Sequence, residues 1–162
     1  MKRLRFAFLS LLVVAGSGCG PDNDLSGSVD ELFPVDVSRV EVLQNDEAFQ
    51  VSYYRNEGAD VDLVVRVTVA LADVVLERGA RVDLAGEYAP GHPRTTVIHL
   101  PAGEPARVFP PVRQGDLHLR AGGVPGTESR GDFSMSFEDT GGFGSGRTLQ
   151  GRFRSEAQDA GF

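Results

Sequence analysis

From residue 33 onward, apolar and polar side chains alternate in short runs separated by turn residues. The clearest run is 61–71, where every second residue from Val61 to Leu71 is valine or leucine. Because successive side chains of a strand point to opposite faces, this run predicts a β-strand with one face in the core. Val64 and Ala70 lie on its other face and indicate partial cover there, so we expect a central strand.

Two neighbouring runs predict a hairpin. Val40 and Val42 alternate with polar residues, and so does the run 49–53. The turn-forming residues 45–47 lie between them. Tyr53 and Tyr54 are adjacent in the second run and must face opposite sides, so we expect one of them in the core.

Shorter runs follow, and prolines limit some of them. The segment 104–111 carries prolines that cannot donate to a ladder, so it is expected to be an edge segment or a loop. No stretch has convincing helical periodicity. About eight or nine short strands predict an all-β fold, an antiparallel β-sandwich or a flattened barrel. The remaining expected strands are 74–76, 81–84, 95–100, 116–120, 132–138 and 147–157, with a Gly-rich gap at 121–131.

The first eighteen residues have the layout of an export signal. Three basic residues precede an apolar run at 6–15, and the small residues 16–18 lead to the single cysteine, Cys19. A membrane-spanning helix needs about 20 apolar residues, and this run has half that length. We therefore interpret residues 1–18 as a signal peptide.

The end of this leader, Val-Ala-Gly-Ser-Gly-Cys at 14–19, resembles the lipobox of bacterial lipoproteins, although Gly16 stands where that family usually has a bulky aliphatic residue. The resemblance implies cleavage before Cys19 and fatty acylation of its sulfur, which gives a stable membrane anchor. Gly20 instead of Asp after the cysteine implies the outer membrane. An ordinary secretory leader cleaved near the same place is the alternative. The runs 131–137 and 146–153 also resemble the closing hairpin of small bacterial β-sandwich lipoproteins.

Charge limits the partners of the mature chain. The leader holds three of the 16 basic residues and none of the 23 acidic ones, so residues 19–162 have a formal net charge of 13 − 23 = −10. Such a chain repels nucleic acid and anionic lipid headgroups. We therefore expect no nucleic-acid partner, and a membrane attachment through the lipid anchor alone.

Residues 19–32 are expected to form the acylated cysteine and a flexible tether, with the β-sandwich at 33–162. The segment 21–30 is too polar to bury much apolar area. Asp22, Asp24 and Asp30 are weak metal candidates because their spacing is similar to the first half of a calcium loop. The twelfth position of that loop is Phe33 instead of glutamate, so we expect no metal or other cofactor.

Candidate catalytic residues are few. His92, His99 and His118 lack the close spacing of zinc ligands and are expected to face solvent on strands, although His99 and His118 could meet across adjacent strands. Ser145 lacks the glycine-flanked five-residue pattern of a nucleophile elbow. We therefore expect that the protein is not an enzyme. Tyr88 and the tyrosine pair could offer ring faces to a sugar or peptide, but there is no tryptophan.

These observations predict an outer-membrane lipoprotein whose non-catalytic β-sandwich is a structural or docking module. Its expected partner is a protein of a cell-envelope assembly such as secretion, pilus or gliding-motility machinery. The alternative is a stand-alone surface module that binds a saccharide, a peptide or calcium.

Overall fold

The computed structural model describes residues 22–58 and 60–161, which are all-β apart from one short 3₁₀ helix, η1 (Ser28–Glu31). None of the helical structure in these residues is long and apolar enough to cross a bilayer. The strands are β1 (Asp24–Ser26), β2 (Arg39–Gln44), β3 (Ala48–Glu57), β4 (Asp60–Ala70), β5 (Arg81–Asp83), β6 (Glu87–Ala89), β7 (His92–Pro93), β8 (Thr95–Leu100), β9 (Arg107–Val108), β10 (Val112–Ala121), β11 (Glu128–Phe137) and β12 (Thr148–Asp159).

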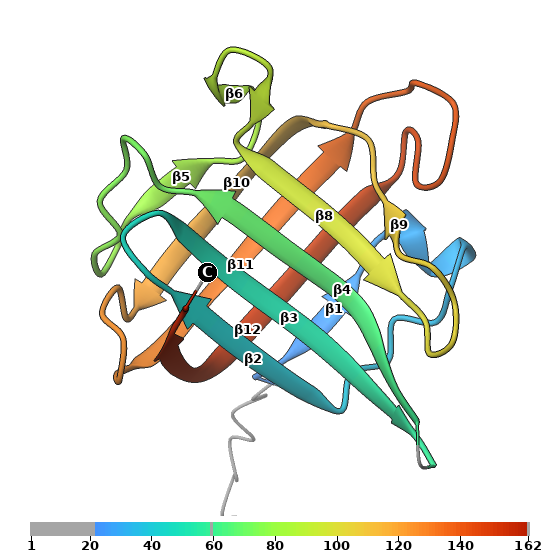
Figure 1. Ribbon diagram of the computed structural model, residues 1–162, viewed down its shortest axis with the longest axis horizontal. Helices are drawn as coiled ribbons and strands as arrows, with labels where there is room; N and C mark the ends of the chain where they lie inside the picture. The colour runs from blue at the N-terminus through green and yellow to red at the C-terminus, as the bar shows by residue number, and fades with distance from the viewer. Residues whose placement is uncertain (1–21, 59, 162) are drawn as a thin grey trace, which may run out of the picture.

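One strongly curled sheet forms both layers of a sandwich-like fold (Figure 1). The front layer holds β2, β3, β4, β8 and β9, and the rear layer holds β5, β10, β11 and β12, with β1 paired to β12. The strands β6 and β7 form a separate small hairpin. The predicted all-β sandwich is confirmed. Its antiparallel character has one exception, because β12 and β2 pair in parallel where the two layers join.

The core lies between the layers and follows the alternation of the strands. Phe49 of β3 and Phe153 of β12 are fully buried, and their ring centroids lie 5.7 Å apart across the two layers. The predicted central strand is confirmed, since β4 pairs with β3 on one side and β8 on the other. Val61 is the exception to its buried face, being 51% exposed near the start of β4.

The expected tether is wrong for the part that the structure describes, residues 22–32. β1 pairs with β12, and the side chains of Leu25, Val29 and Phe33 are buried in the main core. These apolar residues recur at every fourth position, and because all three point into the core, a mostly polar segment can still cover the sandwich. Gly27 permits the close approach: its φ is +123°, and a Cβ there would lie 2.4 Å from the carbonyl oxygen of Thr148.

Several strand boundaries also differ from the prediction. β10 begins at Val112 instead of residue 116, and β11 begins at Glu128 inside the predicted Gly-rich gap. Gly131 of β11 lies against the Phe153 ring and leaves no room for a side chain, since a Cβ there would be 2.6 Å from that ring. Residues 74–76 form no strand, although Leu76 is buried. The prediction of an edge segment at 104–111 is confirmed by β9, the last strand of the front layer.

Candidate functional site: a groove on the front layer

The outer face of the front layer carries a row of three polar side chains on neighbouring strands. Gln50 of β3 pairs with Thr68 of β4, and Thr68 pairs with Thr96 of β8. The hydroxyl of Thr68 donates to the Gln50 carboxamide oxygen at 3.4 Å. Gln50 is only 6% exposed although it lies on the outer face. These residues form the floor of a groove of about 690 Å³.

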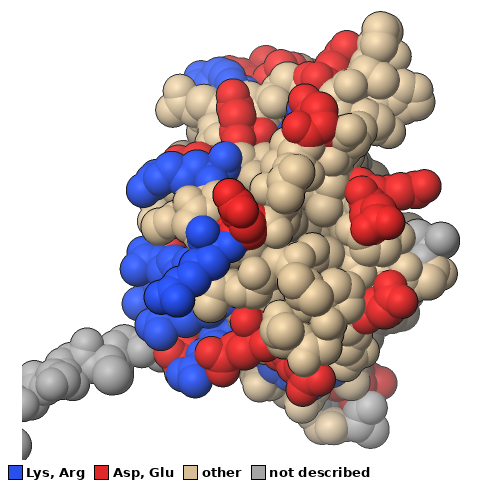
Figure 2. Space-filling model, turned by 90° about the vertical axis from the view of Figure 1, so that its left-hand side faces the viewer, with Lys and Arg blue, Asp and Glu red and all other residues tan. Residues whose placement is uncertain are grey.

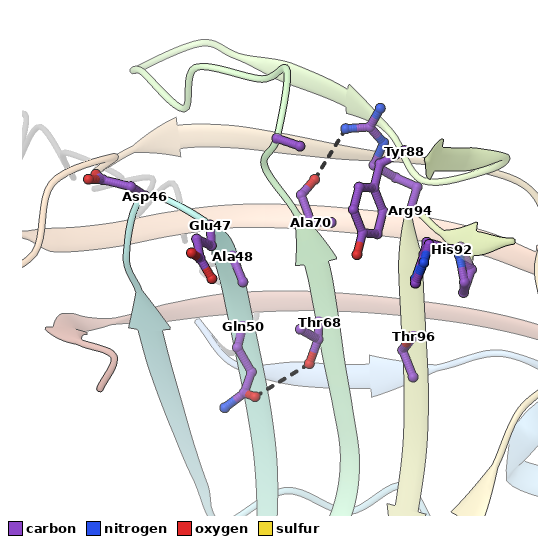
Figure 3. A pocket seen from close by; sticks show the side chains of 12 residues that line it. Asp46, Glu47, Ala48, Gln50, Thr68, Ala70, Tyr88, His92, Arg94 and Thr96 are labelled. Atoms are coloured by element: carbon purple, nitrogen blue, oxygen red, sulfur yellow. Dashed lines mark hydrogen bonds between the residues drawn. The ribbon is translucent and has the colours of Figure 1, made fainter. Parts of the chain in front are cut away.

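One wall of the groove is the turn between β2 and β3. The side-chain oxygen of Asn45 accepts hydrogen bonds from the backbone N–H groups of Glu47 and Ala48, both at 2.9 Å. This local pattern is typical of an Asx turn. It holds the exposed carboxylate of Asp46 and that of Glu47 at the rim (Figure 3).

The opposite wall is the β6–β7 hairpin. Gly91 makes its tight turn with φ +78°, and the Gly91 N–H donates to the Glu87 carboxylate at 3.0 Å. Tyr88 and His92 project from this hairpin over the floor, with ring centroids 5.7 Å apart (Figure 3). The Tyr88 side chain is 41% exposed, so part of its ring is available to a ligand.

Arg94 is the only arginine or lysine among the described residues of the lining, and its charge is neutralised. Its guanidinium donates to both carboxylate oxygens of Asp73, and to the carbonyl oxygen of Ala70 at 3.2 Å. The hydrogen bond with Arg94 lowers the pKa of Asp73, and the same bond raises the pKa of Arg94. The carboxylates of Asp46 and Glu47 therefore set the net charge of the groove.

Comparison of the chain with protein-family models, with curated proteins and with solved structures gives no match. The groove is therefore interpreted from its own side chains. It offers carboxylates, ring faces, hydroxyls and a carboxamide, which together can bind a ligand. Sequence reasoning selected Tyr88 and His92 as candidates but missed the polar row. The sequence carries one signal for that row: Gln50 and Thr68 each lie on the face of a predicted strand that is opposite to its apolar face.

His99 is the sequence candidate whose expected position is wrong. Its side chain is buried in the core, where its Nδ1 lies 2.8 Å from the Val64 carbonyl oxygen and its ring stacks on Phe33 at 4.0 Å. The pKa of His99 is lowered, because the effect of burial is larger than the opposing effect of the hydrogen bond to Val64. A histidine enclosed in this way has a structural role in packing.

The other two histidines and the candidate serine are not brought together. His118 is on β10 in the rear layer, 3.9 Å from Asp132, whereas His99 is on β8 in the front layer. The expected meeting of these two histidines across adjacent strands is therefore wrong. Ser145 hydrogen-bonds with Asp139 at 3.0 Å, and no histidine of the described residues bonds to its hydroxyl.

The three acidic metal candidates do not converge either. Asp24 receives two hydrogen bonds from Arg152, at 2.7 and 3.0 Å, and Asp22 pairs with Arg154 at 3.1 Å. Asp30 belongs to η1. No group of three or more potential metal-binding side chains forms among the residues that the structure describes. Cys19, the expected acylation site, lies outside the described residues.

The tyrosine pair behaves as predicted. Tyr53 is fully buried, and its hydroxyl donates to the Arg152 carbonyl oxygen at 3.1 Å. Burial raises the pKa of Tyr53 well above its usual value. Tyr54 lies on the outer face, where the guanidinium of Arg39 is 4.2 Å from its ring centroid. Tyr53 is thus a core residue, and Tyr88 is the tyrosine that lies in the groove.

Proposed function

We propose that this protein is a lipid-anchored, non-catalytic outer-membrane protein whose front-layer groove docks a protein of a cell-envelope assembly. The observation that supports docking is the position of the groove. The β6–β7 hairpin stands at the top of Figure 1, whereas β1, the described strand nearest to Cys19, begins at the bottom. A domain held at Cys19 would present the groove away from its point of attachment.

The short connection to Cys19 supports the same arrangement. Asp22 and Asp24 are held against β12 through Arg154 and Arg152. Three residue steps separate Cys19 from Asp22, and a chain spans at most about 3.5 Å per residue. The lipid would therefore hold the start of the sandwich within about 10 Å of the bilayer surface. A partner then has to reach the groove from the aqueous side.

A combined labelling and crosslinking experiment tests this proposal. Labelled palmitate should be incorporated into the wild-type chain and not into a Cys19→Ala variant. A photo-crosslinking amino acid at Thr96, on the groove floor, should capture one envelope protein in intact cells. The matched control places it at Gln150, an exposed residue of β12 in the rear layer. Capture of the same protein from both positions, or from neither, would contradict docking through the groove.

The second candidate function is binding of a saccharide by the same groove. The partly exposed Tyr88 ring beside a polar floor favours it, because sugars use ring faces together with hydrogen-bonding side chains. No protein captured at Thr96, together with retention of the purified protein on an envelope polysaccharide, would favour this function over docking.

A further inference from the structure

We propose that the groove takes an extended, basic peptide segment of its partner. This inference rests on the proposed docking function and names the chemistry of the segment. The charge of the site supports it first. Asp46 and Glu47 are exposed at the rim, and Arg94 is already neutralised by Asp73. Figure 2 shows the same bias on a larger scale: carboxylates project from the right-hand side, where the front layer lies, and arginines gather on the left.

The aromatic side chains of the hairpin give the cation a second contact. Tyr88 and His92 face the floor from one wall, and Glu47 lies on the other wall (Figure 3). A lysine or arginine side chain between these walls would meet the ring face of Tyr88 and the carboxylate of Glu47. Ring faces attract cations because their quadrupole is negative above the ring.

The floor supplies contacts for a peptide backbone. Gln50 is 94% buried, and its oxygen is used by Thr68. Its NH₂ group has no acceptor within the described part of the chain. Thr96 is exposed on β8, at the other end of the row and separated from Gln50 by Thr68. Each of these groups can donate to a different carbonyl of a peptide lying across the strands, and neither has a charge that would repel a basic segment. An extended segment could therefore place a carbonyl on the floor and its basic side chain between the walls.

A peptide-binding measurement with the full-length, detergent-purified protein tests this inference. The probe is a fluorescent hexapeptide of alternating lysine and serine, followed by polarisation. The matched peptide has acetylated lysines, which keep the length and lose the charge. We expect binding of the lysine peptide, at least tenfold weaker binding of the acetylated one, and weakening as the salt concentration rises.

Variants locate the binding site. Glu47→Gln should weaken binding about fivefold, as expected for one charge near the surface. Tyr88→Leu should weaken it about threefold. Glu156→Gln is the control, because it removes the same charge from an exposed position on β12 in the rear layer. Both groove side chains are exposed, so these variants should fold.

Three results would overturn the inference: equal weakening by Glu47→Gln and Glu156→Gln, equal binding of the two peptides, or binding of a neutral oligosaccharide in place of the lysine peptide. The first would indicate general attraction to an acidic domain. Capture of a partner at Thr96 without affinity for the lysine peptide would leave docking in place and refute only the basic segment. Affinity for the peptide without capture would refute docking alone.

Discussion

Replacing Val29 by alanine tests whether the N-terminal segment belongs to the sandwich. Val29 is fully buried in η1, and its carbonyl oxygen accepts hydrogen bonds from the N–H groups of Leu32 and Phe33. If residues 22–32 are part of the core, the truncation must lower the free energy of unfolding. If they were a free tether, the change would have no effect on stability.

The size of the effect follows from burial. Valine to alanine removes two carbon groups, each worth about 0.8 kcal/mol when buried. The cavity left behind adds to this transfer term, which gives about 2–3 kcal/mol in total. For a domain of this size, each kcal/mol corresponds to about 3 °C in melting temperature. We therefore expect the Val29→Ala protein to melt about 6–9 °C below the wild type.

Urea unfolding of the protein purified without its first nineteen residues measures this change. The matched control is Val75→Ala, because Val75 is 81% exposed. This variant should stay within about 0.5 kcal/mol of the wild type. A Val29→Ala protein as stable as the Val75→Ala protein would refute the inclusion of η1 in the core.

Other substitutions test the core by urea unfolding. Asp62→Asn should cost about 2–3 kcal/mol, because the Asp62 carboxylate pairs with Arg55 at 2.7 Å in a mostly buried position; an unchanged midpoint would contradict this. Gly151→Ala should cost about 1–3 kcal/mol, since its Cβ would lie 2.5 Å from the Phe133 ring; wild-type stability would show that the ring can move. The lowered pKa of His99 means that the unfolded chain binds more protons. The contribution of His99 to the free energy of unfolding should therefore be fully present above about pH 6.5 and should be lost as the pH is lowered from there towards the folded-state pKa. The free energy of unfolding should fall less steeply with decreasing pH in His99→Gln than in the wild type.

Alternation along the chain was sufficient to predict the centre of the fold. The period-two run of β4 identified a strand with neighbours on both sides, and the turn at 45–47 identified the β2–β3 hairpin. The adjacency of Tyr53 and Tyr54 placed one ring in the core. In each case the pattern was local, because the side chains that decide the structure are close together in sequence.

Features that depend on distant residues could not be predicted in this way. β1 is polar in composition, and it becomes a strand because β12 pairs with it. His99 looked like a strand histidine facing water, and Phe33, 66 positions earlier, supplies the ring that covers it. The groove depends on the β6–β7 hairpin, whose strands of three and two residues are too short to give a periodic signal.

The last strand of the chain connects the whole molecule. β12 pairs with β1 near the beginning of the described residues, with β11, and with β2 where the layers join. β1 therefore cannot reach its final structure until β12, more than 120 residues later in the sequence, is present. Such long-range pairing slows folding. The export that we propose would benefit from this delay, since a chain that is still incomplete stays open enough to be threaded through a translocation channel.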